Sequence, residues 1–111
     1  MKETTKTISA WCEETFGPAH DIARVATRAN EEMAELLTAA TTGQTGYDLV
    51  VECADVVIVL ARLADKQGFD LWQAVENKMV INRNRTWTLD GHGQGYHIST
   101  KESPKTAGKM T

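Results

Sequence analysis

The sequence predicts an all-α fold: a bundle of four helices joined by short loops and followed by an irregular, glycine-rich C-terminal tail. Three observations lead to this expectation. Apolar residues recur at helical spacing in four segments, glycine or proline separates the segments, and 111 residues is the length of one domain. Hydrophobic residues make up 41% of the chain, which allows a modest core that small proteins often complete by oligomerising.

The first two helices are predicted from one-sided apolar patterns. In Thr4–Phe16, apolar side chains recur three, four and eight residues after Ile8 and share one helical face. Phe16-Gly17-Pro18 ends this helix. Ala19–Thr41 repeats the pattern over a longer stretch, and the glycines of Thr41–Gly46 then indicate a loop.

The third and fourth helices have less distinctive sequence patterns than the first two. Val56–Leu60 is rich in β-branched residues and by itself would suit a buried strand. The apolar pattern nevertheless extends over Tyr47–Gln67 and stops at Gly68, so we expect a helix that is apolar nearly all round and therefore central. Asp70 is typical of an N-cap and predicts a fourth helix over Leu71–Arg85.

The boundary of the predicted domain lies near residue 100. We expect residues 1–100 to form a single domain, within which Asp90–Thr100 is glycine-rich and irregular. Residues 101–111 have the composition of a disordered tail.

Charge and composition exclude several classes of protein. The net charge of −3 and the pI near 5.6 argue against binding to nucleic acid or to an anionic membrane. No segment approaches the roughly 20 apolar residues of a membrane span, and the N-terminus lacks the apolar run of a signal peptide. Cys12 and Cys53 lie in apolar patterns without metal-type spacing, so we expect two reduced core cysteines in a cytoplasmic protein.

Two pairs of carboxylates carry the strongest functional signal. Glu32 and Glu35 are three residues apart on one predicted helix, and Glu52 and Asp55 are three apart on the next, so each pair shares a helical face. If these helices are neighbours, four carboxylates converge, repel one another and are costly to bury. A hard divalent cation, Mg²⁺ or Mn²⁺, removes this conflict because such ions prefer oxygen ligands.

Less specific interpretations are also open. The acidic residues of 31–35 can form a solvated helix face in which Arg28 pairs with Glu32, and the second carboxylate pair can form ion pairs with Arg24 or Arg62. A rival from another class is a non-enzymatic, oligomeric helical module that regulates or binds a protein partner through its acidic bundle.

Two other kinds of metal site fit the sequence poorly. A diiron carboxylate bundle needs Glu-x-x-His on two helices, but Thr38 and Asp55 occupy the histidine positions. The dipeptide His20-Asp21 is typical of metal phosphohydrolases that also need a ligand histidine upstream, and His20 is the first histidine of the chain.

A basic segment follows the acidic ones. On the predicted fourth helix, Lys78, Asn82 and Arg85 lie at i, i+4 and i+7 along one face, with Arg83 beside them. Lysine offers a phosphate group a point charge, arginine a bidentate fork and asparagine an amide donor. The plainer interpretation is an ordinary helix C-terminus, where cations interact favourably with the helix dipole.

Together these residues match a known signature. Glu31-Glu32-x-x-Glu35, a gap of sixteen residues and Glu52-x-x-Asp55 resemble the E-E-x-x-E…E-x-x-D motif of the MazG-like all-α nucleotide pyrophosphohydrolases. The Lys-x-x-x-Asn-Arg sequence at 78–83 resembles that family's basic segment. The sequences at 11–17 and 91–98 are similar to its small phage-type members, the MazZ-like dATP/dGTP pyrophosphohydrolases.

The resemblance implies a function. Family members hydrolyse nucleoside triphosphates to the monophosphate and pyrophosphate with Mg²⁺ or Mn²⁺, and the phage-type members imply purine deoxynucleotides, dATP or dGTP, as substrates in the host cytoplasm. A metal-activated water attacks the α-phosphorus and a carboxylate takes its proton. Because family members form dimers or dimers of dimers, we expect a homodimer or homotetramer.

The resemblance also assigns roles position by position. The expected metal ligands are Glu32, Glu35, Glu52 and Asp55. The expected catalytic carboxylates are Glu31 and Glu35. The expected phosphate-binding residues are Lys78, Asn82 and Arg83, to which the predicted helical face adds Arg85.

The base and sugar site is predicted from the residue types alone. Trp11, Phe16, His20 and Trp72 are the rings that can stack on a base, and Asn30, beside the acidic motif, can form hydrogen bonds to a base or sugar. Aromatic residues at helical spacing are more often part of a core.

Overall fold

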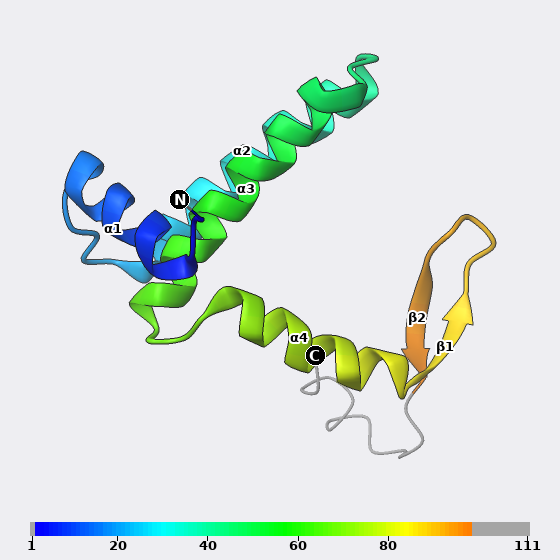
Figure 1. Cartoon of the computed structure of the whole chain (residues 1–111). Helices are drawn as coiled ribbons and strands as arrows, with labels where there is room; N and C mark the ends of the chain where they lie inside the picture. Colours follow the sequence, from blue (N-terminus) through cyan, green and yellow to red (C-terminus); the bar gives the residue numbers. More distant parts are fainter. Residues whose placement is uncertain (1, 99–111) are drawn as a thin grey trace. The chain divides into compact units, whose positions relative to one another are not determined.

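The structure is a computed structural model that describes residues 2–98. It divides into two compact units, Met1–Val75 and Glu76–Thr111. The first unit contains α1 (Thr5–Phe16), α2 (Ile22–Thr41), α3 (Gly46–Lys66) and the start of α4 (Leu71–Arg83). The second unit contains the rest of α4 and two strands, β1 (Thr86–Leu89) and β2 (Gly95–Ile98), all labelled in Figure 1.

The prediction of four helices is confirmed, with shifts at some helix ends. Helix α2 begins at Ile22 instead of Ala19, because the side chain of Asp21 caps it by accepting a hydrogen bond from the backbone N–H of Ala23 at 2.9 Å. The prediction that a fourth helix packs into one bundle with the other three stays a prediction, as does the single domain over residues 1–100.

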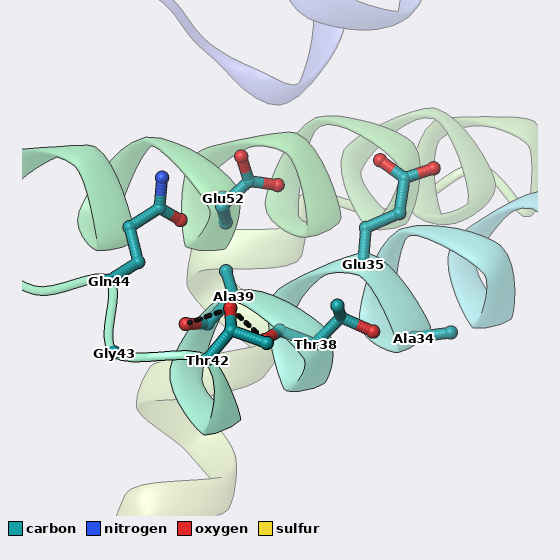
Figure 2. Close-up of a pocket in the computed structure, with 8 residues that line it drawn as sticks. All are labelled: Ala34, Glu35, Thr38, Ala39, Thr42, Gly43, Gln44 and Glu52. Carbon is teal, nitrogen blue, oxygen red and sulfur yellow. Dashed lines mark hydrogen bonds between the residues drawn. The ribbon is translucent and has the colours of Figure 1, made fainter.

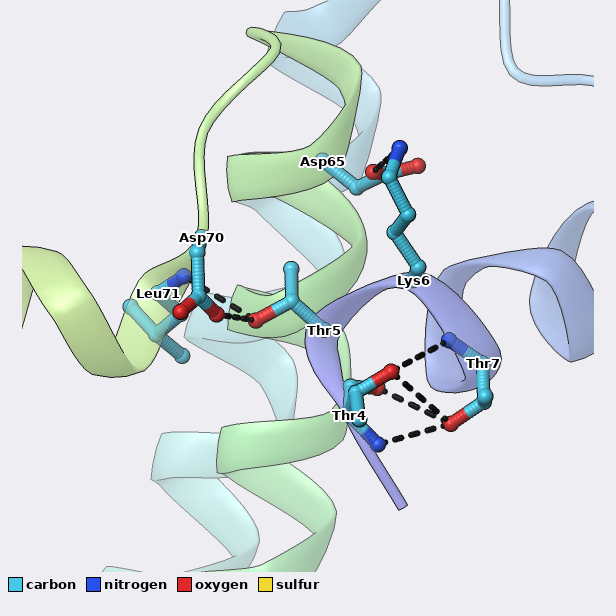
Figure 3. Close-up of polar contacts among 7 residues, drawn as sticks. All are labelled: Thr4, Thr5, Lys6, Thr7, Asp65, Asp70 and Leu71. Atoms are coloured by element: carbon cyan, nitrogen blue, oxygen red, sulfur yellow. Dashed lines mark hydrogen bonds and ion pairs between the residues drawn. The ribbon is translucent and has the colours of Figure 1, made fainter.

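Helix α1 begins at a reciprocal capping box, drawn in Figure 3. The Thr4 hydroxyl accepts from the Thr7 backbone N–H at 3.1 Å, and the Thr7 hydroxyl accepts from the Thr4 N–H at 2.7 Å. Two N–H groups that the helix cannot pair are thereby satisfied. The helix ends before Gly17, whose φ of 88° disfavours any residue with a side chain.

Helix α3 is central in the first unit, as predicted, because both α1 and α2 pack against it. Figure 1 shows α2 and α3 side by side as a long antiparallel pair. The buried apolar residues come from all three helices: Cys12, Val25, Ala29, Val56 and Ala61.

Only the second half of α3, residues 56–66, is buried or half-buried along its whole length. The ion pairs and hydrogen bonds between α1 and α3 fall on residues 62–66 of this half. In the first half, Val50, Val51 and Cys53 are exposed. The prediction of a core cysteine is therefore correct for Cys12 and wrong for Cys53.

The start of α4 is tied to the start of α1. Asp70 caps α4 as predicted, with Oδ1 accepting from the Trp72 N–H at 3.4 Å. The same oxygen accepts a 2.5 Å hydrogen bond from the hydroxyl of Thr5, which in turn accepts from the Leu71 N–H at 3.0 Å (Figure 3). The hydrogen bond from Thr5 is the main reason why the pKa of Asp70 lies below its usual value of 3.8.

We expect Thr5→Val to lower the free energy of unfolding by about 1–2 kcal/mol, because the Leu71 N–H loses its partner while the shape of the buried side chain is kept. The folded-state pKa of Asp70 is lowered, so the Thr5 bond to its carboxylate contributes fully above the usual pKa and is lost as pH falls through the folded value. Urea unfolding at several pH values measures the difference, with the exposed Thr15→Val as control. An equal difference at all pH values would contradict the role of the Asp70 carboxylate.

A β-hairpin follows α4 where the sequence predicted an irregular tail. Strands β1 and β2 pair antiparallel, with Trp87 opposite His97. The Asp90 side chain accepts from the N–H groups of His92 at 2.7 Å and Gln94 at 3.0 Å, which closes the glycine-rich turn. A Cβ at Gly95 would lie 2.8 Å from a strand carbonyl oxygen, so close pairing requires glycine there. The prediction of irregular structure is therefore wrong for residues 95–98.

The described helices also bear on two other expectations. None of them within residues 2–98 has both the length and the apolar composition needed to cross a membrane. The predicted disordered tail at 101–111 lies outside the described residues.

Candidate active site

The predicted metal ligands line the seam between α2 and α3. Glu32 on α2 is buried, with 6% of its surface exposed. Glu52 and Asp55 on α3 are half-buried, and Glu35 on α2 is exposed. Within residues 2–98, Glu32 is the one buried residue that carries a formal charge.

The environment of Glu32 confirms that the carboxylates are neighbours. Burial raises its pKa above the usual value, and the negative charges of Glu35, Asp55 and Glu52 raise it further, while Arg28 opposes the rise. An uncompensated carboxylate in such a place destabilises the fold. This seam therefore favours the binding of positive charge.

Arg28 provides part of that charge. Its guanidinium contacts Glu32 four residues on and lies 3.0 Å from the Glu31 carboxylate. The expected Arg28–Glu32 pair is thus present. Glu31 is exposed and directed to this arginine.

The other expected ion pairs are absent from the described residues. Arg62 pairs with Glu13 of α1, and within residues 2–98 neither it nor Arg24 forms an ion pair with Glu52 or Asp55. The interpretation of Glu52 and Asp55 as members of a structural ion-pair network is therefore wrong for this part of the chain.

The four carboxylates are chemically suited to binding a hard divalent cation. Three carboxylates adjoin a buried fourth, and all four supply oxygen ligands of the kind that Mg²⁺ and Mn²⁺ prefer. In the conformation described for residues 2–98, no three histidine, cysteine or acidic side chains converge closely enough to hold a metal ion. Binding would therefore require the carboxylates to turn toward one another and Glu32 to leave Arg28.

Two hollows adjoin the seam, one beside each half of the carboxylate set. An open hollow of about 680 Å³ is bordered by Glu35 and Glu52, together with Thr38, Thr42 and Gln44 from the end of α2 and the following loop. Figure 2 shows Glu35 projecting from α2 and Glu52 from α3 at its edge. Most of the residues that line this hollow are polar, and it is open to solvent.

The second hollow is an apolar cavity of about 600 Å³, within the range of roughly 300–1,000 Å³ typical of small-molecule sites. Glu32 and Asp55 lie in its lining. The apolar wall comes from the three helices and from the segment between α1 and α2: Trp11, Cys12, Phe16, Ala19, Val25, Ile58 and Val59. The cavity thus joins an apolar pocket to two of the predicted metal ligands, and we call it the apolar cavity.

Only some of the predicted base-binding residues lie in the apolar cavity. Trp11 and Phe16 line it and contact each other edge to face, with ring centroids 5.4 Å apart. Asn30, His20 and Trp72 are exposed and do not line this cavity.

The sequence suggested ion pairs for three arginines but did not predict that they line the same cavity. Arg24, Arg28 and Arg62 line it beside Glu32. The signal was present for two of them, because Arg24 and Arg28 precede Glu32 at helical intervals of four residues and must share its face.

The predicted phosphate-binding residues belong to the second unit. Lys78 and Asn82 are half-buried on α4, and Arg83 is its exposed last residue. Arg85 lies beyond the helix, so its predicted place on the same helical face is wrong. The cause is a turn in which the side chain of Asn84 donates to the Val80 carbonyl oxygen at 2.8 Å, ending the helix before β1 begins.

Known proteins were compared with this chain in sequence and in fold. No protein-family model matches the chain. A solved structure of the cyanophage S-2L MazG-like pyrophosphohydrolase, bound to dGDP and three catalytic Mn²⁺ ions per active site, matches with a TM-score of 0.65 and 29% identity, over 86% of this chain and 93% of that one. The chain is thus similar in sequence and fold to a phage MazG-like pyrophosphohydrolase.

Two curated relatives are named dATP/dGTP diphosphohydrolase. The protein of Salmonella phage PMBT28 is 36% identical over 98 residues, which are 88% of this chain and 31% of that protein. The protein of cyanophage S-2L is 37% identical over 54 residues, 49% of this chain and 51% of that protein. The matches therefore span about a third to a half of the length of these relatives.

Proposed function

We propose that this MazG-like chain hydrolyses purine deoxynucleoside triphosphates, dATP or dGTP, to the monophosphate and pyrophosphate, with Mg²⁺ or Mn²⁺ as cofactor. The observation that carries the proposal is the buried Glu32, adjoined by three further carboxylates and by a cavity of nucleoside size. The names of the relatives and the dGDP and Mn²⁺ of the cyanophage structure support the choice of substrate and cofactor. Because nucleotide pools are cytoplasmic, the host cytoplasm is the expected place of action.

The proposed ligands are Glu32, Glu35, Glu52 and Asp55. When bound there, a divalent cation would neutralise phosphate charge and lower the pKa of a water molecule. To hold the cation, Glu32 would give up its contact with Arg28, and this arginine, which lines the apolar cavity, would then be available to the substrate.

The proposed reaction is water attack on the α-phosphorus. The bond from this phosphorus to the oxygen that bridges the α- and β-phosphates breaks, and pyrophosphate leaves. Glu35 is the better-placed group to take the proton from water, because it is exposed at the seam. Glu31 is already paired with Arg28, which suits a supporting role.

The remaining parts of the nucleotide are assigned to groups of matching chemistry. Trp11 and Phe16 offer ring faces and edges to the base. Lys78, Asn82, Arg83 and Arg85 are proposed to bind the phosphates through charge and amide donors.

We further propose that the chain forms a homodimer or homotetramer. Exposed apolar side chains gather on α2 and on the first half of α3: Met33, Leu37, Tyr47, Val50 and Val51. Met33 and Leu37 are four residues apart on α2, and Tyr47 precedes Val50 by three and Val51 by four residues on α3. Each group therefore shares a helical face, of the kind that protein interfaces cover. Light scattering on the purified chain measures the mass, and a monomer at micromolar concentration would contradict this part of the proposal.

An activity panel tests the proposed function. The purified protein is incubated with each of the four dNTPs and four NTPs in Mg²⁺ or Mn²⁺, and the products are separated by ion-exchange chromatography. We expect equal amounts of monophosphate and pyrophosphate, fastest from dATP or dGTP, and no diphosphate. No product from any nucleotide with either metal would contradict the proposal and favour the partner-binding helical module.

A further inference from the structure

An ion-pair network holds the aromatic end of the apolar cavity and has no part in the proposed chemistry. Glu13 of α1 accepts hydrogen bonds from Arg62 Nε at 2.8 Å and Lys66 Nζ at 2.9 Å, both on α3. Arg62 Nη2 reaches Glu13 Oε2 at 2.7 Å and the Gly17 carbonyl oxygen, also at 2.7 Å. The Ala19 N–H donates to Glu13 at 3.4 Å. One carboxylate thus joins the end of α1, the turn after it and α3.

In the sequence, Glu13 lies between the two aromatic residues that wall the cavity. Trp11 precedes Glu13 by two residues and Phe16 follows it by three. The rings are 53% and 67% exposed, so burial does not fix their positions. Helix α1 buries a different set of small side chains against α3: Thr5, Ser9 and Cys12. The contacts that the structure shows at the end of α1, beside the rings, are the polar ones of Glu13 and Arg62.

The network has the properties of a rigid link. The Arg62 side chain is 13% exposed and the Glu13 side chain 27% exposed, so the pair is far less screened by solvent than a surface ion pair. Hydrogen bonds from Lys66 and Arg62 lower the pKa of Glu13 to about 2, which keeps it ionised at any pH used for assay. Arg62 also lines the apolar cavity itself, so the residue that anchors α1 faces the same space as the rings.

We propose that Glu13 is a positioning residue for nucleobase binding: through Arg62 it sets the place of Trp11 and Phe16 at the apolar cavity, and with it the preference for purines. The inference rests on the proposed function. It assigns to Glu13 an effect on binding and selectivity, with the hydrolytic step left to the carboxylates of the α2–α3 seam.

The test is a comparison of steady-state kinetics in Glu13→Gln, Glu13→Asp and wild type, with dGTP and dCTP as substrates. Glu13→Gln keeps the size of the side chain and removes its charge. We expect KM for dGTP to rise roughly tenfold, since small displacements of positioning groups have effects of this size or larger, while kcat changes by less than about twofold. The ratio of kcat/KM for dGTP to that for dCTP should fall, and Glu13→Asp should restore part of both properties.

Glu14→Gln is the matched control, because Glu14 is the adjacent carboxylate on α1 and is exposed. We expect it to leave KM, kcat and the dGTP to dCTP ratio unchanged. Unchanged KM and ratio in Glu13→Gln would overturn the inference, as would an equal loss of kcat for both substrates with KM retained, which a purely structural role predicts. If wild type hydrolyses neither dATP nor dGTP, the proposed function itself fails; if wild type is active and Glu13→Gln behaves like it, only the positioning role fails.

Discussion

Replacing Glu32 by Gln is expected to reduce kcat for dGTP by roughly 10³-fold or more while leaving the helical fold intact. The substitution keeps the size of the side chain and removes the one buried formal charge of residues 2–98. Its stability effects oppose each other. Glutamine relieves the repulsion from the neighbouring carboxylates, whereas Arg28 loses one of its two partners.

Circular dichroism and single-turnover kinetics check both halves of this prediction. We expect a helical spectrum and a metal-free melting midpoint within a few degrees of wild type. The exposed Glu14→Gln serves again as control and should be fully active. A Glu32→Gln protein with normal turnover would show that Glu32 holds no catalytic metal.

The second large effect concerns the metal itself. Ligands that bind only the folded state stabilise it, by about 2.7 kcal/mol at a hundredfold excess over Kd. We therefore expect millimolar Mn²⁺ to raise the melting midpoint of wild type by several degrees. The double variant Glu52→Gln/Asp55→Asn should lose this shift, because it removes both α3 ligands and half of the negative charge of the seam.

The melting experiment is repeated with deoxyguanosine monophosphate, so that a metal that binds only together with nucleotide is also detected. The non-enzymatic helical module predicts no metal-dependent shift in either condition. A shift of equal size in the double variant would instead place the metal away from the α2–α3 seam.

Much of the first unit could be predicted from local features of the sequence. Apolar spacing and single caps such as Asp70 determine where helices begin and end, and both act over a few residues. The neighbouring placement of the two acidic pairs followed from one assumption, that consecutive helices joined by a short loop pack together. The environment of Glu32 confirms it.

Features that depend on distant partners could not be predicted in this way. Cys53 sits in an apolar run, but its exposure depends on which part of α3 the neighbouring helices cover. The pairing of Glu13 with Arg62 joins residues 49 positions apart, and local spacing contains no signal for it. The hairpin was missed because its strands have four residues each, too few for an alternating pattern to be distinguished from a glycine-rich loop.

The position of bond cleavage is the most direct test of the central claim that water attacks the α-phosphorus. Hydrolysis of dGTP by wild type in ¹⁸O-labelled water with Mn²⁺, followed by mass spectrometry of both products, identifies the phosphorus that is attacked. We predict one ¹⁸O atom in the deoxyguanosine monophosphate and none in the pyrophosphate. Label in the pyrophosphate would mean attack at the β-phosphorus and would contradict the account.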